Sequence, residues 1–328
     1  MISTRALTRD FVVSRTETVH AVRGISLDVA PGELVAVLGP NGAGKTTTLR
    51  MLTTLITPTS GTATVAGYDV TTQPSQVRRR IGYVGQGNGA GHNQRVGDEL
   101  AGQGVIYGLD RRAAKSRAGE LLEALELTDL ARRKVSELSG GQRRRLDVAM
   151  GLVHAPSLLF LDEPSTGLDP QNRANLWDHI LRMRERYEMT IVLTTHYLDE
   201  ADSMAERVVV VDHGEVIADD TADALKAKLA GDRIALTVAP GNLDRLRRIA
   251  EQVPGAAEVV AVGDEVSLRV VDGPATLPQL VGLAQQNGVP IAAAQVHRPT
   301  LDDVFLNLTG RSLREDSNDS TRFTGRAA

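Results

Sequence analysis

The sequence predicts an α/β protein in which a largely parallel sheet with helices on its faces is followed by a small α+β domain. Three observations support this fold class. Apolar runs of strand length alternate with helical segments over most of the chain. One of these runs leads into a glycine-rich turn and then a helical pattern. Near the carboxyl end, the elements follow the order strand, helix, strand, strand, helix, strand. At 328 residues, the chain is long for one domain and comfortable for two.

The first predicted strands, Ile25–Val29 and Leu34–Leu38, lie on either side of the turn Pro31-Gly32. The second strand leads directly into G-P-N-G-A-G-K-T-T, and Lys45–Leu55 continues with the apolar spacing of a helix. We therefore expect a strand and a helix joined by the glycine-rich loop.

Four later runs have the length and composition of strands: Leu158–Leu161, Thr190–Thr195, Val208–Asp212 and Glu215–Ala218. Between the glycine-rich loop and these strands, Leu109–Leu138 combines leucine and alanine periodicity with abundant charge. This pattern is typical of solvent-exposed helices, so we expect an inserted helical subdomain at about residues 87–145.

A domain boundary is expected near a short helix that Thr221 caps and Gly231 ends. The six elements after it give the βαββαβ order of a ferredoxin-like domain and are predicted at Arg233–Ala239, Leu243–Gln252, Ala257–Val262, Val266–Val271, Leu277–Gln286 and Ile291–Val296. The polar residues 311–328 are expected to be disordered. The predicted domains are thus 5–230 and 232–310.

The composition restricts the function classes. With 41% hydrophobic residues the chain is suited to sizeable cores, but no apolar stretch reaches the roughly 20 residues of a membrane span. A net charge of −4 argues against a nucleic-acid binder, and the absence of cysteine excludes disulfides and thiolate metal sites. We expect an intracellular protein that would serve a membrane only through a partner.

The glycine-rich loop matches G-x-x-x-x-G-K-[ST] and is expected to bind phosphate, because its glycines let backbone N–H groups close around an anion at a helix N-terminus. Its residues are Gly39, Pro40, Asn41, Gly42, Ala43, Gly44, Lys45, Thr46 and Thr47. Lys45 would reach the terminal phosphates, and the Thr46 hydroxyl would ligate Mg²⁺. A glycine turn without function is the alternative, but the preceding strand and following helix argue against it.

A carboxylate pair ends the apolar run Leu158–Leu161. Asp162 is placed to hold Mg²⁺ through water, and Glu163 to orient or deprotonate an attacking water as a general base. Alone, such a pair is most often the start of a solvated loop. Together with the phosphate loop it indicates nucleotide hydrolysis.

The segment L-S-G-G-Q comprises Leu138, Ser139, Gly140, Gly141 and Gln142 and precedes a long helix. Taken singly, it would be a flexible turn. About twenty residues before the Asp-Glu pair, however, it resembles the signature of the ATP-binding-cassette (ABC) family. The family's other motifs are matched in order by Gln86 in the Q-loop, Asp169 in the D-loop and His196 in the switch region. Phe11 lies where the family places an aromatic ring that stacks on adenine.

The resemblance implies an ATPase that uses ATP and Mg²⁺, with Lys45, Gln86, Glu163 and His196 in catalysis. Thr46, Gln86 and Asp162 would support the metal. In the family, the signature closes over the nucleotide of a second subunit, which implies an ATP-dependent dimer of this chain. Ser139, Gly140, Gly141, Gln142 and Asp169 would then act at the partner's nucleotide.

A narrower resemblance rests on R-R-R-L-D-V-A, on T-T-H-Y-L-D-E-A-D and on L-D-D-V-F-L-N-L-T-G at Leu301–Gly310. These resemble ATP-binding subunits of the daunorubicin-resistance type, which pair with an integral membrane permease to export drugs or antibiotics. The implied location is the cytoplasmic side of the membrane. Leu301–Gly310 also reads as an amphipathic terminal helix packing on its own domain.

The sequence departs from the family pattern at two places near Gln86, and two alternatives to the exporter function remain. Gly85 stands where many members have proline, and the following G-N-G-A-G-H-N-Q is unusually rich in glycine. Because this region faces the membrane partner in the family, the departures concern partner and cargo rather than ATP hydrolysis. The alternatives are a soluble ABC ATPase without a transporter and the ATPase of an importer. Two cassettes in one chain or long coiled coils would favour the soluble class, and the sequence has neither.

Overall fold

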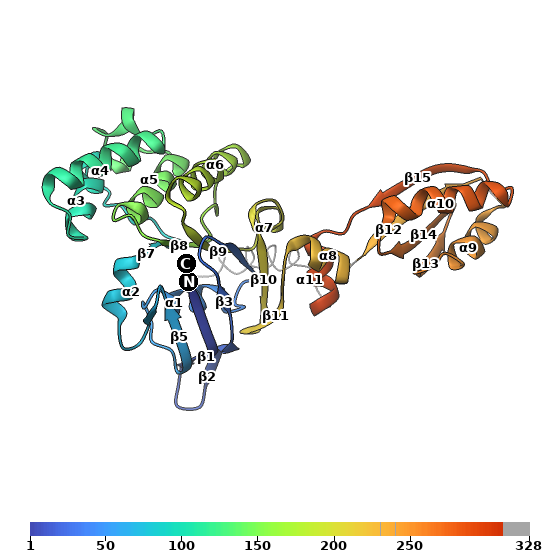
Figure 1. The fold of residues 1–328 in the computed structure, drawn as a ribbon, viewed down its shortest axis with the longest axis horizontal. Helices are drawn as coiled ribbons and strands as arrows, with labels where there is room; N and C mark the ends of the chain where they lie inside the picture. Colours follow the sequence, from blue (N-terminus) through green and yellow to red (C-terminus); the bar gives the residue numbers. More distant parts are fainter. Residues whose placement is uncertain (230, 240, 311–328) are drawn as a thin grey trace, which may run out of the picture. The chain divides into compact units, whose positions relative to one another are not determined.

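The computed structural model describes residues 1–229, 231–239 and 241–310, and no helix in these ranges is long and apolar enough to cross a membrane. The chain divides into two compact units, Met1–Asp219 and Asp220–Ala328, which are considered separately (Figure 1). The expectation for residues 311–328 lies outside the described residues.

The central sheet of the first unit has six strands in the order β11-β10-β4-β9-β8-β7 (Figure 1). Strands β10, β4, β9, β8 and β7 are parallel to their neighbours in this set, as predicted. Every residue of β4, β8 and β9 is buried, which explains their continuous apolar sequences. The strands are β4 (Leu34–Leu38), β7 (Ile81–Val84), β8 (Leu158–Asp162), β9 (Thr190–Thr195), β10 (Arg207–Asp212) and β11 (Glu215–Asp220).

The helices of the same unit lie beside the sheet (Figure 1). They are α1 (Lys45–Leu52), α2 (Pro74–Arg80), α6 (Pro170–Tyr187) and α7 (Leu198–Met204). Of these, α6 and α7 directly connect parallel strands of the sheet. The inserted helical subdomain is confirmed and contains α3 (Val96–Ile106), α4 (Arg111–Ala124) and α5 (Gly140–Leu152). Asp110 caps α4 by accepting hydrogen bonds from the backbone N–H groups of Arg112 and Ala113, both at 2.9 Å.

A second, antiparallel sheet was not anticipated from the sequence. It consists of β1 (Ile2–Val12), β2 (Thr18–Ile25), β3 (Asp28–Val29), β5 (Ser60–Val65) and β6 (Tyr68–Asp69). The prediction of one strand over Ile25–Val29 was wrong, because the chain leaves the ladder between β2 and β3. There the Leu27 N–H donates to the Thr4 hydroxyl at 2.8 Å, and that hydroxyl contacts the carbonyl oxygen of Ile25 at 3.2 Å. A side chain thus replaces the backbone partner that a continuous strand would need.

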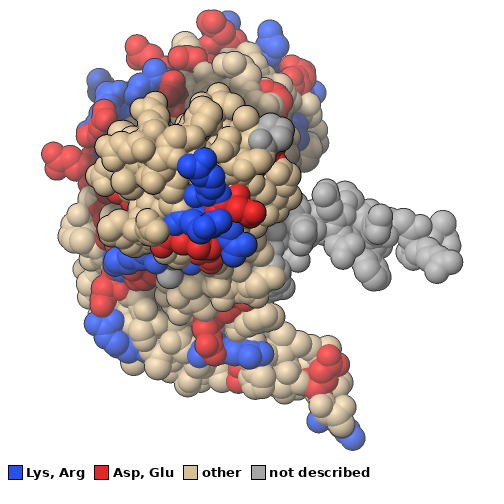
Figure 2. All heavy atoms as spheres, turned by 90° about the vertical axis from the view of Figure 1, so that its right-hand side faces the viewer, with Lys and Arg blue, Asp and Glu red and all other residues tan. Residues whose placement is uncertain are grey.

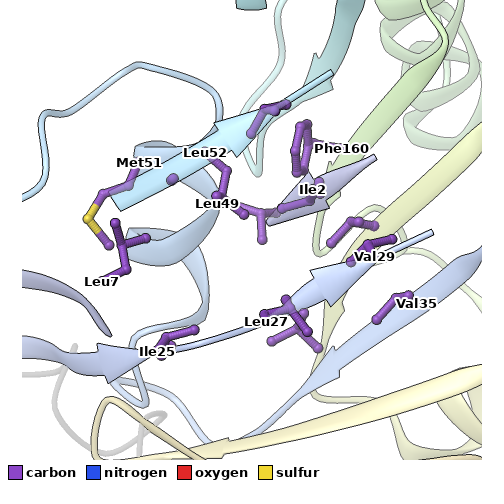
Figure 3. Packing of buried hydrophobic residues seen from close by; sticks show 14 of the residues in the cluster. Ile2, Leu7, Ile25, Leu27, Val29, Val35, Leu49, Met51, Leu52 and Phe160 are labelled. Atoms are coloured by element: carbon purple, nitrogen blue, oxygen red, sulfur yellow. The ribbon is translucent and has the colours of Figure 1, made fainter. Parts of the chain in front are cut away.

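The core that holds α1 in place lies between the two sheets. Figure 3 shows side chains from the antiparallel sheet, β4, α1 and β8 gathered in this core. Leu49, Met51 and Leu52 supply the buried face of α1, and Phe160 is fully buried on β8. Burial of this apolar area fixes the helix that follows the glycine-rich loop, so the loop is supported by the main core of the unit.

The second unit has a four-stranded antiparallel sheet in the order β13-β14-β12-β15, and its elements follow the predicted βαββαβ order. They are β12 (Asp232–Val238), α9 (Leu243–Glu251), β13 (Ala257–Val262), β14 (Glu265–Val270), α10 (Gly273–Gln286) and β15 (Ile291–His297). Helix α10 begins earlier than predicted because Asp272 caps it, accepting from the Ala275 N–H at 3.0 Å. Helix α8 (Ala222–Leu229) precedes this domain, and α11 (Leu301–Thr309) follows it.

Candidate active site

The phosphate-type loop joins β4 to α1 and depends on glycine at particular positions. Gly42 and Gly44 have φ angles of 80° and 100°, and a Cβ at Gly39 would lie 2.1 Å from the Val211 carbonyl oxygen. The loop borders an open pocket of about 480 Å³. The pocket is lined by Asn41, Gly42, Ala43, Gly44, Lys45, Thr46 and Thr47, together with Gln86, Glu163 and residues of β2 and the β10–β11 turn. The N-terminus of α1 and its free N–H groups belong to this wall, which favours an anion.

The Lys45 ammonium is buried inside the loop, with 4% of its side chain exposed. Its Nζ donates to the carbonyl oxygens of Gly39 at 2.6 Å and Pro40 at 3.0 Å. Burial lowers the pKa of Lys45, although Glu163 and Asp162 oppose this shift. The closest carboxylate oxygen is 3.9 Å away on Glu163. A buried cation whose direct partners are neutral carbonyl groups is well suited to receive a phosphate oxygen.

The three residues proposed for metal support lie together. The Thr46 hydroxyl donates to Asp162 Oδ1 at 2.9 Å, and Gln86 Nε2 donates to Thr46 Oγ1 at 3.1 Å. No cluster of three or more His, Cys, Asp or Glu in the described ranges could hold a metal without further ligands. Mg²⁺ is usually held by one or two carboxylates together with phosphates and water. The hydroxyl, amide and carboxylate oxygens here fit that ion when a nucleotide completes the set.

Glu163 stands at the carboxyl end of β8 in a strained conformation, with a φ angle of 48°. Its Oε2 lies 3.3 Å from His196 Nδ1, without the geometry of a hydrogen bond, and accepts from the Thr166 hydroxyl at 3.2 Å. Burial raises the pKa of Glu163, but the proximity of His196, Lys45 and Thr166 outweighs it, so the net shift is downward. The carboxylate is therefore held ionised next to the phosphate pocket.

A set of buried hydroxyl groups supports this strand end, and its role was not recognised in the sequence. Thr194 Oγ1 donates to Asp162 Oδ1 at 2.7 Å, and the Glu163 N–H contacts both Thr194 O and Oγ1 at 3.1 Å. Thr195 donates to Glu200 Oε2 at 2.8 Å. The two threonines before His196 were the available signal, but the sequence does not show which acids they contact.

The L-S-G-G-Q segment begins α5 with a reciprocal cap. The Gln142 N–H donates to Ser139 Oγ at 3.3 Å, and the Ser139 N–H donates to Gln142 Oε1 at 3.0 Å. Gly141 packs closely against Asn172, since a Cβ there would lie 2.5 Å from Asn172 Oδ1 and would displace that side chain. Asn172 in turn contacts Asp169, donating from Nδ2 to Oδ2 at 2.5 Å. These residues form a second cluster, apart from the phosphate pocket.

The structure thus brings together one group of the residues selected from the sequence and leaves another group apart. Lys45, Thr46, Gln86 and Glu163 line one pocket, Asp162 is hydrogen-bonded to Thr46 behind it, and His196 lies beside Glu163. Within the described part of the chain, Ser139, Gly140, Gly141, Gln142 and Asp169 have no hydrogen bond to the phosphate loop and do not line its pocket.

Phe11 lies on β1 directly opposite Val19 of β2, which lines the phosphate pocket. The residue is 37% exposed, and the Arg9 guanidinium lies over its ring at 4.7 Å from the centroid. The neighbouring His20 also lines the pocket and contacts Asp10 at 2.8 Å. An exposed ring beside the pocket is available for stacking with a flat ligand.

Two family models match the chain. The model described as ABC transporter matches residues 22–166, and the model described as ATP-binding protein DrrA1-3-like, C-terminal domain, matches residues 221–309. The two matched ranges lie in different compact units of the structure.

Similar proteins cover almost the whole chain. The daunorubicin resistance ATP-binding protein DrrA2 of Streptomyces coeruleorubidus is 44% identical over 89% of this chain and 91% of that protein. The daunorubicin/doxorubicin resistance ATP-binding protein DrrA of Streptomyces peucetius is 38% identical over 96% of both chains. The linearmycin resistance ATP-binding protein LnrL of Bacillus subtilis is 35% identical over 90% of this chain and 95% of that protein.

Solved structures share the fold of the first unit. A dimeric post-hydrolysis state of the ATP-binding cassette MJ0796, bound to ADP and phosphate, is 25% identical with a TM-score of 0.62. It covers 67% of this chain and 98% of that chain. The cbiO1 subunit of the cbiONQ transporter complex from Clostridium perfringens has the same TM-score of 0.62 at 24% identity, over 77% of this chain and 95% of that chain.

Proposed function

We propose a function from one premise: this chain belongs to the ABC transporter family, in the group of daunorubicin-resistance-type ATP-binding proteins. It is an ATPase that binds ATP, and it is the ATP-hydrolysing subunit of an exporter. We propose in addition that the cargo is a drug, an antibiotic or another small hydrophobic compound. The names of the similar resistance proteins support this choice over a soluble ABC ATPase or an importer.

The proposed mechanism rests on one observation: Lys45, Thr46 and Glu163 line the same pocket, with Asp162 bonded to Thr46 and His196 beside Glu163. Lys45 would leave the loop carbonyls to neutralise the terminal phosphates of ATP. Thr46, Gln86 and Asp162 would hold Mg²⁺, which supplies positive charge to the transferring phosphoryl group when bound.

Glu163 is proposed as the general base. Its carboxylate is ionised and would accept the proton of a water molecule as that water attacks the terminal phosphorus. The bond that breaks joins this phosphorus to the bridging oxygen, which leaves with ADP. His196, 3.3 Å from the same carboxylate, would contact the terminal phosphate and help to position the water.

A second copy of the chain is the proposed partner in each ATP site. The resemblance to the ABC family implies that the signature closes over a second subunit's nucleotide, and the MJ0796 cassette was solved as a dimer. Here Ser139, Gly141 and Asp169 form a cluster apart from their own phosphate pocket, with Ser139 at an exposed helix N-terminus. Two-fold symmetry would place each cluster over the other chain's nucleotide, making two equivalent composite sites.

The other proposed partner is an integral membrane permease, as the resemblance to ATP-binding subunits of the daunorubicin-resistance type implies. Val105, Ile106 and Tyr107 at the end of α3 expose apolar surface, 79% in the case of Ile106. Tyr107 lines a cavity of about 220 Å³ together with Gly85, Gly87 and Gly89. These three glycines belong to the loop that contains Gln86. Apolar surface next to a loop that contacts the ATP site is suited to transmit movement to a partner.

Binding to the cytoplasmic face of the membrane would follow from this partner. No nucleic-acid partner is proposed. The net charge is −4, and basic and acidic residues lie side by side on the face shown in Figure 2. We further propose that residues 5–230 and 232–310 are separate domains and that the second one modulates coupling or dimer stability.

The test is co-expression with a candidate permease, followed by purification of the complex. We expect the two proteins to co-purify and hydrophobic drugs to stimulate ATP hydrolysis. Ile106→Asp should weaken co-purification while the isolated chain retains its basal ATPase activity. Glu215→Ala, at an exposed position of β11, is a control that should affect neither measurement. A wild-type chain that binds no permease and hydrolyses ATP without any drug response would contradict the exporter assignment.

A further inference from the structure

Arg144 on α5 has an almost fully buried guanidinium, with 9% of its side chain exposed. Its Nη2 donates to the carbonyl oxygens of Asp162 at 3.4 Å and Glu163 at 3.3 Å. Its Nε donates to the carbonyl oxygen of Pro164 at 2.5 Å. Its Nη1 donates to the Gly85 carbonyl oxygen at 2.7 Å. One side chain therefore joins the end of the catalytic strand to the peptide that precedes Gln86.

These carbonyl groups belong to a segment that needs support. Glu163 has a positive φ angle of 48°, which costs free energy for a residue with a side chain and persists only when its surroundings fix it. Its N–H is held by Thr194 of β9, and its carbonyl is held by Arg144 of α5. The Thr166 N–H donates to the same carbonyl at 3.3 Å, so the backbone of the proposed base is fixed on both sides and Arg144 supplies one of the two contacts at its carbonyl.

Asp147 completes the arrangement from the same helix. It is 5% exposed, and its Oδ1 accepts from the Gly89 N–H at 3.0 Å. Its Oδ2 lies 4.0 Å from Arg144 Nη1 and has no hydrogen-bond partner in the described part of the chain. Burial lowers the pKa of Arg144, and the negative charge of Asp147 opposes that shift. The pair therefore places opposite charges together in the interior and contacts both ends of the loop 85–89.

We propose that Arg144 and Asp147 are positioning residues for ATP hydrolysis, which hold the Gln86 loop and the Glu163 backbone in one active arrangement. The inference rests on the proposed function and extends it. Their hydrogen bonds go to backbone groups of the loop and of the catalytic strand end, so their proposed role is to position other groups. Since loop 85–89 lies beside the proposed permease surface, Arg144 also provides a direct connection from that surface to the base. Movement of the loop would alter the backbone that orients Glu163.

The experiment compares substitutions at Arg144 with the same substitutions at Arg117 in the full chain. Arg117 is a matched control because its side chain is similarly buried, at 13% exposed, and donates to the Leu152 carbonyl oxygen at 3.2 Å and the Tyr187 hydroxyl at 2.7 Å. In the described structure it has no hydrogen bond to residues 85–89 or 162–164. The variants are Arg144→Lys, Arg144→Gln, Arg117→Lys and Arg117→Gln. The measurements are kcat, KM, affinity for a fluorescent ATP analogue, and the thermal midpoint.

Arg144→Lys should lower kcat at least about tenfold while changing analogue affinity by less than about threefold, because small displacements of catalytic groups are costly whereas the phosphate loop stays intact. Arg117→Lys should keep kcat within about twofold at a comparable loss of thermal midpoint. Asp147→Asn preserves an acceptor for Gly89 but removes the charge, and should show the same separation of kcat from affinity with a smaller loss.

Several results would overturn the inference. One is an equal loss of kcat at both arginines for an equal loss of thermal midpoint, which would make Arg144 merely structural. Another is a loss of affinity for the ATP analogue that is large enough to explain the whole loss of ATPase activity in the Arg144 variants. If Arg144→Gln does not fold, Arg144→Lys and Asp147→Asn decide, and wild-type kcat in both would refute the proposal. A wild-type chain without ATPase activity would instead contradict the proposed function itself.

Discussion

His196 Nδ1 lies 3.3 Å from Glu163 Oε2, at the carboxyl ends of two adjacent parallel strands. The Lys45 ammonium lies 3.9 Å from the other oxygen of the same carboxylate. A buried acid is thus flanked by two groups that favour its ionised form. This relationship gives the carboxylate the charge that a base requires and leads to the first two predictions.

The first prediction concerns pH. The pKa of Glu163 is lowered: burial alone would raise it, but His196, Lys45 and Thr166 together prevail. Glu163 should therefore remain ionised as pH falls. The fall in kcat that its protonation causes should begin only below the usual glutamate pKa of about 4.3. His196→Ala removes one of the groups that lower the pKa of Glu163, so burial should raise this pKa in the variant. The acid limb of the residual activity should then move to higher pH. The measurement is kcat at saturating ATP against pH. A wild-type acid limb near neutrality would contradict this assignment.

The second prediction is that Glu163→Gln retains ATP binding and nearly abolishes hydrolysis. Removal of a general base costs roughly 10²–10⁴-fold, while the phosphate loop is unaffected. ATP should then hold a stable dimer, detectable by size-exclusion chromatography with Mg²⁺. Glu188→Gln is a matched control, since Glu188 also has a positive φ angle, 49°, and is exposed away from the pocket. A Glu163→Gln variant that hydrolyses ATP at the wild-type rate would exclude Glu163 as the base.

The third prediction is that Phe11→Ala raises KM more than it lowers kcat. Stacking on adenine would stabilise bound ATP and the transition state alike, and a loss of such uniform binding appears in KM. The Arg9 guanidinium that lies over the Phe11 ring would have to move away or occupy the face of the ring opposite to adenine. Val12→Ala, at the next and 78% exposed position, serves as the control and should leave both constants unchanged. An unchanged KM with a large fall in kcat would show that Phe11 is not the adenine platform.

The parts of the site that are local in sequence could be anticipated. The phosphate loop is one continuous segment, and its geometry follows from the glycines at 39, 42 and 44 between a buried strand and a helix. Asp162 and His196 each follow an apolar run, and parallel strands bring their carboxyl ends to one edge. Most of the central sheet was predicted for the same reason, because β4, β8 and β9 are buried throughout and read as apolar runs. The short edge strand β7 was not predicted.

The parts that depend on distant partners could not be anticipated. Strand β1 mixes buried, half-buried and exposed residues without a regular period, and it is identified mainly by pairing with β2 and β5. Arg144 was visible only as one of three consecutive arginines, and its acceptors are backbone carbonyls, which carry no sequence signal. Gly141 likewise shows its packing constraint only when Asn172 is placed against it.

The fourth prediction concerns truncation. Removing residues from Asp232 onward should leave ATP binding intact, since every pocket residue lies earlier in the chain. This cut separates α8 from α11, its packing partner, and would expose the buried side chain of Leu225 on α8. A cut after Asp220 removes both helices, so it should bind ATP equally well and aggregate less. Light scattering and nucleotide titration measure the two effects. Loss of ATP binding in a folded truncation would show that the domains are not independent.

The fifth prediction tests the composite site by mixing two inactive chains. Lys45→Ala damages the phosphate loop, and Ser139→Arg blocks the signature and also removes the cap of α5, at a cost of about 1 kcal/mol. Neither homodimer should hydrolyse ATP, because each of its sites contains one damaged half. Ser139→Ala removes the cap without the bulk and controls for the loss of stability.

In the mixed dimer, both defects fall in one site, while the other site combines an intact Lys45 with an intact Ser139 from the opposite chain. If each site turns over alone, mixing should restore at most about half of the wild-type activity per dimer, from two-fold symmetry. If each chain used its own Ser139, both chains would stay inactive after mixing. Obligatory coupling between sites would also give no activity, so ATP-dependent heterodimer formation and nucleotide occlusion must be measured in the same samples. Heterodimers that form with ATP but occlude no nucleotide would exclude the composite site. In that case an intact Lys45 from one chain and an intact Ser139 from the other would have failed to enclose ATP between them.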